Sequence, residues 1–222
     1  MRAPISVVIP TLNAAEELPE TLGRLALGLG SVREVIVSDG GSADATRAIA
    51  EDAGATVVEG PPGRGGQLRR GADAASGPWL LFLHADTHLP DGWEDAARAH
   101  MLGERAGWFR LAFRAKGLGA RWTAGWANVR SRFGLPYGDQ GLLIPRPLYD
   151  AVGGFDDVPL MEDVRMARAL RGKLAPIGVT VTTSAHRYER RGWVRQGARN
   201  LGTLGRYLAG ASPDALAERY RR

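Results

Sequence analysis

The sequence contains no cysteine, only two lysines (Lys116 and Lys173), and no apolar run approaching the ~20 residues that a membrane-spanning helix needs. The lack of cysteine excludes disulfide bonds, thiolate catalysis and zinc–cysteine sites, but it leaves the cellular compartment open. The first residues, MRAPISVVIP, hold a short apolar run that is typical of a first strand and not of a signal peptide. We therefore expect a soluble or peripheral protein that is cytoplasmic by default.

Two nucleotide-binding fingerprints are also missing. No GxGxxG follows the first strand-like run, and no G-x-x-x-x-G-K-[ST] occurs anywhere in the chain. The Gly-rich loop GPPGRGG at 60–66 has neither the lysine nor the Ser/Thr of a P-loop. These absences argue against a dinucleotide-dependent dehydrogenase and against a P-loop NTPase.

The charge that is present is mostly arginine. Basic residues outnumber acidic ones by 29 to 24, which gives a net charge of +5 and a pI near 10.1. Such an excess suggests nucleic-acid or membrane binding. However, the arginines are spread along the chain, and beside so much Ala and Gly their number can reflect coding bias. An anionic small molecule or an anionic membrane surface suits this distribution better than a nucleic-acid duplex.

The chain has 222 residues, of which 44% are apolar, enough to bury the core of one domain. Its first ninety residues alternate between short β-branched runs and helical patterns. Strands are predicted at 5–10, 34–39, 55–60 and 79–86, with helices at 14–27, at 43–53 and through QLRRGADAA. This alternation predicts a parallel sheet with helices on both faces.

Beyond residue 90 the pattern becomes less regular. Strands are predicted at 108–115, 141–146 and 177–184, and helices near 118–131, 162–171 and 193–209. This half is therefore expected to be mixed α+β.

Polar side chains follow the predicted strands of the first half. They are Thr11 and Asn13 after the first strand, Asp39 after the second, Arg64 after the third, and His84 and Asp86 at the end of the fourth. Taken singly, each has an ordinary explanation as a turn or loop residue. Together they favour a ligand site, because open parallel sheets bind ligands at the carboxyl ends of their strands.

The residues also resemble a known family. Seven stretches, in order and almost end to end, are similar to family 2 glycosyltransferases of the GT-A fold, and more narrowly to the bacterial group often labelled radical-SAM/selenodomain-associated transferase 2. They are VVIPTLN (7–13), DGGSADAT (39–46), GRGGQLRRGA (63–72), LFLHADTHLP (81–90), NVRSRFGLPYGDQG (128–141), GGFDDVPLMEDVRMARALR (153–171) and TSAHRYERRG (183–192). The resemblance implies an α/β fold with one GT-A domain over 1–222, a nucleotide-binding half at 1–90 and an acceptor-binding half with C-terminal helices at 91–222.

The fourth strand of the GT-A fold ends in a D-x-D motif, and the residues here are His84, Ala85 and Asp86. A departing nucleoside diphosphate carries negative charge that a divalent cation neutralises. The resemblance implies that Asp86 binds Mn²⁺ or Mg²⁺, since hard cations prefer carboxylate oxygen, and that a downstream histidine, His186, completes the shell. His84 then contacts the ribose, contacts the metal through its imidazole, or does neither. His88 is expected on the surface.

The resemblance assigns the donor contacts to a set of nine residues: Pro10, Thr11, Asn13, Asp39, Arg64, Gln67, His84, Asp139 and Gln140. Thr11 and Asp39 are expected to hold the base and ribose, while Arg64 and Gln67 reach toward the base or the diphosphate. Asp139 and Gln140, in the sequence PYGDQG, either form an ordinary turn or line the sugar pocket.

Glu162 and Asp163 begin a helical pattern, where acidic residues are also favoured for ordinary electrostatic reasons. By the resemblance they form the ED motif. Asp163 is then the general base that takes the proton of the acceptor hydroxyl, and Glu162 assists it or caps the helix. A single displacement of this kind inverts the configuration at the anomeric carbon.

The function implied by the resemblance is metal-dependent, inverting transfer of a sugar from a nucleotide-diphosphate donor, UDP-sugar by default, to a hydroxyl acceptor. A sugar nucleotidyltransferase and a non-catalytic membrane-surface protein are the alternatives, and no nucleic-acid partner is expected. Trp122, Trp126 and Val129 share one face of a basic predicted helix. That face either packs in the core or forms a lid or a peripheral contact with the inner membrane face, which would suit a lipid-linked acceptor.

Overall fold

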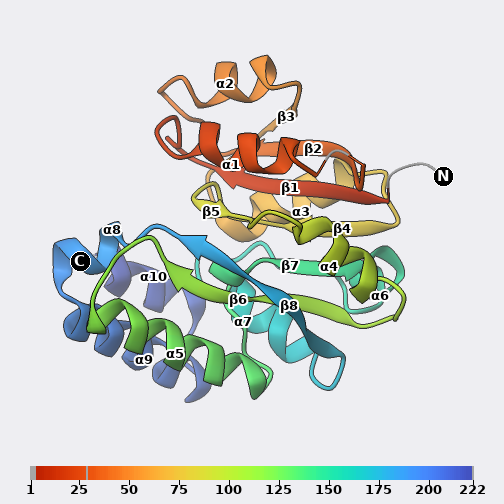
Figure 1. Cartoon of the computed structure of the whole chain (residues 1–222). Coiled ribbons are helices and arrows are strands. Elements are labelled where there is room, and N and C mark those ends of the chain that lie inside the picture. The colour runs from red at the N-terminus through yellow and green to blue at the C-terminus, as the bar shows by residue number, and fades with distance from the viewer. Residues whose placement is uncertain (1–3, 29, 222) are drawn as a thin grey trace.

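The computed structural model describes residues 4–28 and 30–221, and within them one eight-stranded sheet runs through the molecule in the order β3-β2-β1-β4-β7-β6-β8-β5 (Figure 1). The strands are β1 (Ile5–Thr11), β2 (Val32–Asp39), β3 (Thr56–Glu59), β4 (Trp79–Phe82), β5 (Thr87–His88), β6 (Ala106–Phe113), β7 (Leu142–Pro145) and β8 (Leu174–Thr183).

The helices follow the strands in chain order. They are α1 (Leu18–Ala26), α2 (Thr46–Asp52), α3 (Arg64–Ala74), α4 (Trp93–His100), α5 (Leu118–Arg132), the 3₁₀ turn η1 (Gly138–Gln140), α6 (Arg146–Ala151), α7 (Glu162–Ala169), α8 (His186–Arg191), α9 (Trp193–Leu208) and α10 (Pro213–Arg221). Among the helices in the described ranges, none is long and apolar enough to cross a membrane.

The first part of the sheet is parallel, as the alternating pattern predicts. β2 and β4 flank β1 in parallel, and β3 is parallel to β2. The carboxyl ends of these strands therefore meet at one edge. The second part is mixed: β7 runs antiparallel to both β4 and β6, whereas β8 is parallel to β6. Strands and helices both occur in this second part, so the prediction of a mixed α+β second half is also confirmed. The two parts share one continuous sheet.

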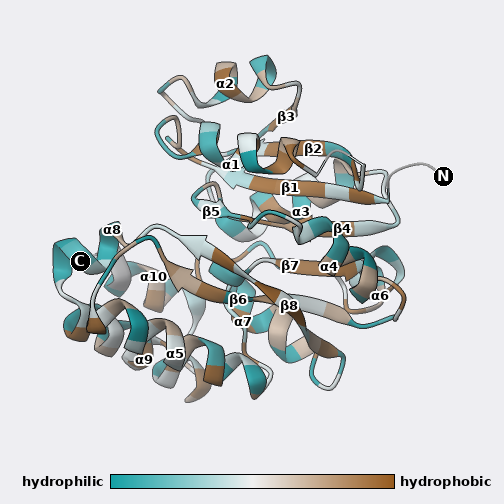
Figure 2. Cartoon of the chain, viewed as in Figure 1, coloured by the Kyte–Doolittle hydropathy of each residue, from teal (hydrophilic) through white to brown (hydrophobic). Residues whose placement is uncertain are grey.

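Side chains alternate between two cores on the two faces of the sheet. Val7 and Leu81 point to a core that also holds residues of α1, α4 and α5, while Val8 and Leu80 point to one shared with α3, α6 and α7. This is the period of two that strands impose. In Figure 2 the largely brown strands lie between helices in which teal and brown segments are mixed. Helices therefore cover both faces, as predicted.

Local pattern placed several boundaries too early or too late. The helix expected from Ala14 begins at Leu18, because residues 14–17 form a turn whose backbone is tied to the α2 region: Ala14 N donates to Thr46 Oγ1 at 2.8 Å. The strand expected to reach Asp86 ends at Phe82, and a turn follows in which Thr87 N donates to His84 O at 3.1 Å. Five elements were not predicted as such: β5, α4, α6, α8 and α10.

Candidate active site at the carboxyl ends of β1, β2 and β4

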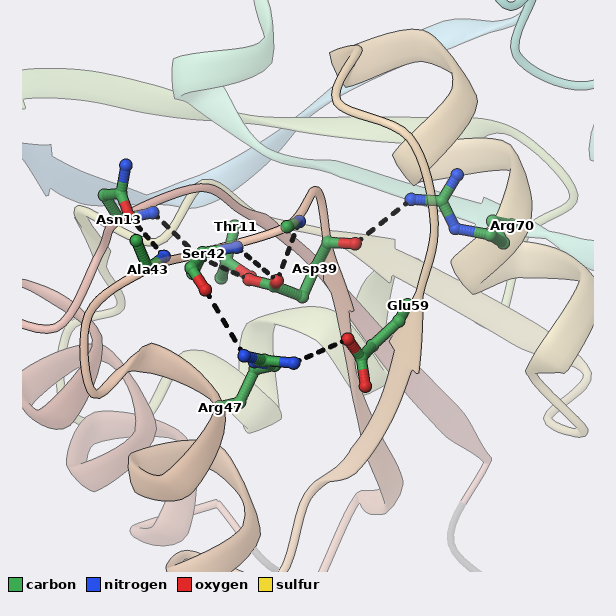
Figure 3. A network of polar contacts seen from close by, with 9 residues as sticks. Thr11, Asn13, Asp39, Ser42, Ala43, Arg47, Glu59 and Arg70 are labelled. Carbon is green, nitrogen blue, oxygen red and sulfur yellow. Dashed lines mark hydrogen bonds and ion pairs between the residues drawn. The ribbon is translucent and has the colours of Figure 1, made fainter.

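Asp39, the last residue of β2, is the centre of a buried hydrogen-bond network (Figure 3). Its Oδ1 accepts from the backbone N–H groups of Gly41 at 2.9 Å and Ser42 at 2.7 Å. Its Oδ2 accepts from the hydroxyls of Thr11 at 2.9 Å and Ser42 at 2.5 Å. Burial raises the pKa of Asp39, but these hydrogen bonds outweigh it and hold the pKa below its usual value. The carboxylate is therefore ionised.

The four donors use all the lone-pair directions that a carboxylate offers. If Asp39 accepts a hydrogen bond from a nucleotide base, one of its present donors must turn away. The hydroxyls of Thr11 and Ser42 can rotate, whereas the two backbone donors are fixed by the turn after β2. The expected contact between Asp39 and a base therefore involves an exchange at Oδ2, and it stays a prediction.

The surrounding loops are held to this network. Pro10 lies in β1 opposite Ser38, and Asn13, which has a φ of 51°, accepts from Ala43 N at 2.9 Å. Gln67 is buried, and its Nε2 donates to the carbonyls of Thr11 at 2.6 Å and Ser38 at 2.9 Å. Gln67 thus ties α3 to the ends of β1 and β2. Both N–H groups of its amide are therefore engaged, so donation from Gln67 to a nucleotide would have to displace one of these bonds.

The turn from His84 to Asp86 is fixed from both parts of the sheet. Thr21 of α1 donates to Ala85 O at 2.7 Å, and Arg114, just beyond β6, donates to Asp86 O at 2.6 Å. Arg114 also pairs with Glu17. The backbone of the turn is therefore held by two side chains that come from opposite directions.

Charge around this turn makes Asp86 unusual. Burial and then the nearby Glu17 raise the pKa of Asp86, and the cations of Arg114 and Arg187 offset this only in part. Burial, Arg64 and Arg187 lower the pKa of His84 well below its usual value, so its imidazole is neutral. In the described chain, His84 Nε2 is buried without a hydrogen-bond partner, and a Cβ at Gly138 would lie 2.6 Å from it.

The η1 turn carries Asp139 and Gln140 to the same region. Burial and the neighbouring carboxylates of Asp163 and Asp86 raise the pKa of Asp139 to about 6, against the opposing effect of Arg130. Within the described residues, Asp139 Oδ1 is buried and has no hydrogen-bond partner. Gln140, by contrast, is fully buried: its Nε2 donates to Phe109 O at 3.1 Å and its Oε1 accepts from Ser131 Oγ at 2.6 Å. Gln140 holds η1 in place, and its expected contact with a sugar stays a prediction.

The start of α7 adds two more acidic side chains. Asp163 Oδ2 accepts from Gly138 N at 3.0 Å, and its Oδ1 accepts from Val164 N at 2.7 Å. Glu162 is only 2% exposed and pairs with Arg64 Nη1 at 3.2 Å. Burial raises the pKa of Glu162, Arg64 opposes this, and the adjacent Asp163 raises it further. Arg64 therefore links α3 to the acidic start of α7.

The donor chemistry of this site fits a divalent cation, although the protein alone does not supply a full shell. No group of three or more His, Cys, Asp or Glu side chains in residues 4–28 and 30–221 is arranged to hold a metal ion. The charge of Asp86 nevertheless raises the pKa of Asp139, and Asp139 Oδ1 lacks a hydrogen-bond partner in the described residues. A cation beside them would relieve both costs. Mg²⁺ in particular is commonly held by one or two carboxylates and completed by phosphate oxygens and water.

His186 and His88 differ in exposure. His186 is exposed at the start of α8, and its neighbour Arg187 is the residue whose charge acts on both Asp86 and His84. The role of His186 as a ligand stays a prediction. The expectation that His88 lies on the surface is wrong: it is 5% exposed, because β5 pairs with β8, and its Nδ1 lies 3.3 Å from Glu20 Oε1.

Three arginines at this site, Arg114, Arg130 and Arg187, were not among the predicted site residues. Arg130 of α5 lies over the Tyr137 ring at 3.2 Å from its centroid and acts on Asp139. Arg130 and Arg187 lie in two of the stretches that resemble the family, NVRSRFGLPYGDQG and TSAHRYERRG, whereas Arg114 lies in none of them. A lone arginine in a helix carries no local sign of its target, since the target comes from another part of the chain.

Comparison with known proteins agrees with this geometry. The family described as Glycosyl transferase family 2 matches residues 6–133, which is more than half of the chain. A PGL/p-HBAD biosynthesis glycosyltransferase of Mycobacterium bovis is 38% identical over 112 residues, covering 47% of this chain and 44% of the relative. Glycosyltransferase AglJ of Haloferax volcanii is 36% identical over 84 residues, covering 37% and 27%. The match thus spans less than half the length of these curated relatives.

Solved structures are similar over more of the chain. Glucosyl-3-phosphoglycerate synthase from Mycobacterium tuberculosis, in complex with Mn²⁺, UDP and glucosyl-3-phosphoglycerate, has a TM-score of 0.58 and 24% identity, covering 81% of this chain and 70% of that one. S. aureus TarS in complex with UDP has a TM-score of 0.65 and 17% identity, covering 83% and 60%. The likeness concerns the fold, and it confirms the predicted α/β GT-A fold.

Proposed function

Since this chain belongs to glycosyl transferase family 2, we propose that it transfers a sugar from a nucleoside-diphosphate donor, UDP-sugar by default, to a hydroxyl acceptor, with inversion and with a divalent cation. The observation that carries the proposal is the convergence of Asp86, Asp139 and Asp163. They come from three elements, and each of the other two raises the pKa of Asp139. A cluster of this kind at the carboxyl ends of parallel strands suits a cation and its anionic ligand.

Residues 1–90 form the donor half in this proposal. Thr11, Asn13 and Asp39 receive the nucleoside, and a hydroxyl on Asp39 Oδ2 gives way to a base N–H. Two solved structures of similar fold contain UDP, which supports UDP-sugar as the first donor to test. Arg64 lies beside the diphosphate, where its guanidinium can donate to phosphate oxygens while it stays paired with Glu162.

Asp86 is the proposed ligand of Mn²⁺ or Mg²⁺, with His84, Asp139 and His186 as the neighbouring candidates. The cation supplies charge neutralisation for the leaving diphosphate. The chain's own residues supply the rest: Arg114 and Thr21 hold the turn that carries Asp86, and Arg187 brings a further positive charge to the same place. Mn²⁺ in a complex of the similar-fold synthase supports the choice of this cation for the assay.

Residues 91–222 form the acceptor half, and Asp163 is the proposed general base. The acceptor oxygen attacks the anomeric carbon, and the bond between that carbon and the diphosphate oxygen breaks. The proton of the acceptor hydroxyl passes to a carboxylate oxygen of Asp163. Gly138 and Val164 each donate one backbone hydrogen bond to this carboxylate and so fix its direction. Glu162, buried beside Arg64, positions the start of α7. One displacement on one face gives inversion.

The narrower resemblance to the radical-SAM/selenodomain-associated group rests on the sequence motifs alone, and we keep it as part of the proposal. No observation favours a sugar nucleotidyltransferase: residues 12–17 after β1 read LNAAEE, which contains no basic residue to hold a triphosphate.

The test is a thermal-shift panel of nucleotide sugars and nucleoside diphosphates, each with Mn²⁺ and with chelator, on the parent, Asp86→Asn and Asp91→Asn. Asp91 is exposed and close in sequence, so Asp91→Asn controls for the loss of one charge. We expect UDP with Mn²⁺ to stabilise the parent and Asp91→Asn, and chelator or Asp86→Asn to abolish the shift. An equal shift in Asp86→Asn would show that Asp86 does not bind the cation. No shift with any nucleotide would overturn the function.

A further inference from the structure

The outer face of α5 is apolar where a surface helix is normally polar. Leu118, Trp122, Trp126, Val129 and the following Phe133 are all exposed, with Trp122 at 74% and Phe133 at 83%. At 3.6 residues per turn these five positions fall within about 80° of arc, so they form one stripe. The helix packs inward through small residues instead, namely Ala120, Ala124, Ala127 and Ser131. The alternative that placed Trp122, Trp126 and Val129 in the core is therefore wrong.

α9 repeats this arrangement beside α5. Val194, Leu201 and Leu208 are seven residues apart and exposed, with Val194 at 87%. The spacing keeps them within about 40° of arc on one side of the helix. The two helices contact one another, and a Cβ at Gly119 of α5 would lie 2.7 Å from the ring of Trp193. They lie side by side in Figure 1, and Figure 2 shows brown segments on both. We call the eight exposed residues of these two stripes the α5–α9 face.

Arginine accompanies the apolar stripes, and acidic residues are absent from both helices. Arg121 and Arg132 lie to one side of the α5 stripe, and Arg195 and Arg206 to one side of the α9 stripe. All four are exposed, and none forms an ion pair with a carboxylate in the described part of the chain. Aromatic and aliphatic side chains beside unneutralised arginines are the composition of helices that lie at an anionic membrane surface.

A basic cavity lies between α9 and α10, at least about 120° around α9 from the residues of its stripe. It has a volume of about 220 Å³ and is lined by Arg199, Thr203, Arg206, Leu216 and Arg219, from α9 and α10. Three guanidinium groups and a hydroxyl around one hollow suit a phosphate group, which guanidinium binds in a bidentate manner.

We propose that the α5–α9 face is a docking surface for an anionic lipid bilayer, with Trp122, Phe133 and Val194 among the side chains that enter the headgroup region. The charge of the face decides between occupants: a second copy of this chain would bring the same unneutralised arginines against each other, whereas anionic lipid neutralises them. The proposal is independent of the sugar-transfer reaction, because it concerns a surface and not the site.

The helix α9, which carries part of the α5–α9 face, also packs against residues beside the candidate site. The inner side of α9 contributes Leu204 to a small core that contains Met161 and Val164, which flank Glu162 and Asp163. α8, which carries Arg187, contacts α9. Docking would therefore orient the acceptor half toward the bilayer, and a hydroxyl acceptor attached to lipid would approach from that side.

The experiment is co-sedimentation of the protein with vesicles of phosphatidylcholine alone and of phosphatidylcholine mixed with an equal amount of phosphatidylglycerol. We expect binding to the mixed vesicles only, weakened by added salt. Trp122→Ser/Phe133→Ser should reduce the affinity at least tenfold, because two large apolar side chains leave the interface. Arg121→Gln/Arg132→Gln should reduce it about fivefold per arginine. Leu102→Ser and Arg98→Gln, exposed sites in and just after α4 and outside the α5–α9 face, should bind as the parent does.

Three outcomes overturn the proposal. They are no binding to either vesicle, equal binding by parent and variants, and a salt-stable dimer that Trp122→Ser/Phe133→Ser converts to a monomer, which would assign the face to a second copy. Unfolding midpoints and the UDP–Mn²⁺ thermal shift are recorded for every variant. A variant that binds UDP but not vesicles separates the lipid surface from the nucleotide site, and failure of UDP binding in the parent leaves the vesicle result unaffected.

Discussion

The two halves of the molecule differ most in charge. Residues 1–90 contain seven basic and 11 acidic residues, a net charge of −4, whereas residues 91–222 contain 22 basic and 13 acidic residues, a net charge of +9. The overall charge of +5 conceals this division. The arginines that seemed merely spread along the chain are concentrated in the half that is expected to receive the acceptor.

This difference bears on how the donor is held. A nucleoside diphosphate would bind to the acidic half, whose carboxylates repel it. Neutralisation must come from elsewhere: from a cation beside Asp86, from Arg64 in α3, and from Arg187, which the basic half extends toward the same turn. The donor half on its own is therefore expected to bind nucleotide poorly, and each half needs the other to complete the site.

The halves also differ in exposed apolar surface. Of the large hydrophobic residues that are exposed in the described part of the chain, Leu12 and Leu27 belong to the first half, Leu102 to the second, and the remaining eight all belong to the α5–α9 face. Scattered exposed leucines are ordinary in soluble proteins, whereas a continuous group indicates a partner. The positive charge and the exposed apolar surface both lie in residues 91–222. Both therefore indicate that this half binds a partner other than the nucleotide.

The largest expected effect is on turnover, and it comes from replacing the proposed base Asp163 of the second half while the donor half stays intact. Asp163→Asn keeps an oxygen that can accept from Gly138 N–H but removes the base, so turnover should fall ~10²–10⁴-fold while UDP–Mn²⁺ binding stays close to that of the parent. UDP release from the best donor of the thermal-shift panel measures the first, and the thermal shift itself measures the second. Asp157→Asn, an exposed acid in the same half, is the control. Unchanged turnover would remove Asp163 as the base.

The fold of the first half was largely predictable because its signals are local. The runs ISVVIP and EVIVSD are β-branched, alternate between two cores, and form β1 and β2. The two-residue strand β5 was not predictable, because it exists only through its pairing with β8, about a hundred residues away. The same pairing buries His88. A polar residue after a polar turn is expected on the surface, and that expectation failed here because the pairing with β8 cannot be seen in the local sequence.

For the site, sequence indicated the positions but not the partners. Asp39 and Asp86 were predicted as site residues from their place after strands, and Asp163 from the family motif. The ties that fix them, such as Arg114 on Asp86 O and Gly138 on Asp163, join residues 25 or more positions apart. Gln67 and Gln140 illustrate the limit, because the motif shows that an amide is present but not that it is engaged inside the protein.

The next largest expected effect is on stability, and it comes from the contact between the two halves at α3. A Cβ at Gly65 would lie 2.1 Å from Asp156 O, a backbone atom of the second half that cannot move aside cheaply. Gly65→Ala should therefore lower the free energy of unfolding by about 3 kcal/mol, measured by urea denaturation. Gly23→Ala, in α1 with nothing within 4 Å of the added Cβ, is the control and should raise it by up to about 1 kcal/mol. Equal effects at both positions would contradict the close packing of the halves.

Asp139 gives a pH-dependent effect on stability of up to about 3 kcal/mol. Its pKa of about 6 in the folded protein lies above the value of 3.8 for an unperturbed aspartate, so the folded state binds this proton more tightly than the unfolded state. Stability through this group is therefore present at low pH and is lost as the pH rises from about 4 to about 6. Asp139→Asn should remove that loss, so that the variant gains relative to the parent between these pH values in denaturation experiments. A parallel pH profile would refute the shift.

The smallest effect distinguishes an ion pair between the halves from one within a half. Arg114 pairs with Glu17 across the sheet while also holding the Asp86 turn, and both side chains are partly buried. Arg47 and Glu59 pair at 2.7 Å in the first half alone, and both are largely exposed. Double-mutant cycles with glutamine should give a coupling of about 1 kcal/mol for the first pair and at most about 0.5 kcal/mol for the second. The first pair should also couple to UDP–Mn²⁺ binding, because loosening Arg114 releases the carbonyl of Asp86, whereas Arg47→Gln should leave that binding unchanged. If both cycles gave the same coupling and neither pair affected binding, the second half would not position the metal-binding turn, and the division of labour between the halves would fail at the place where they meet.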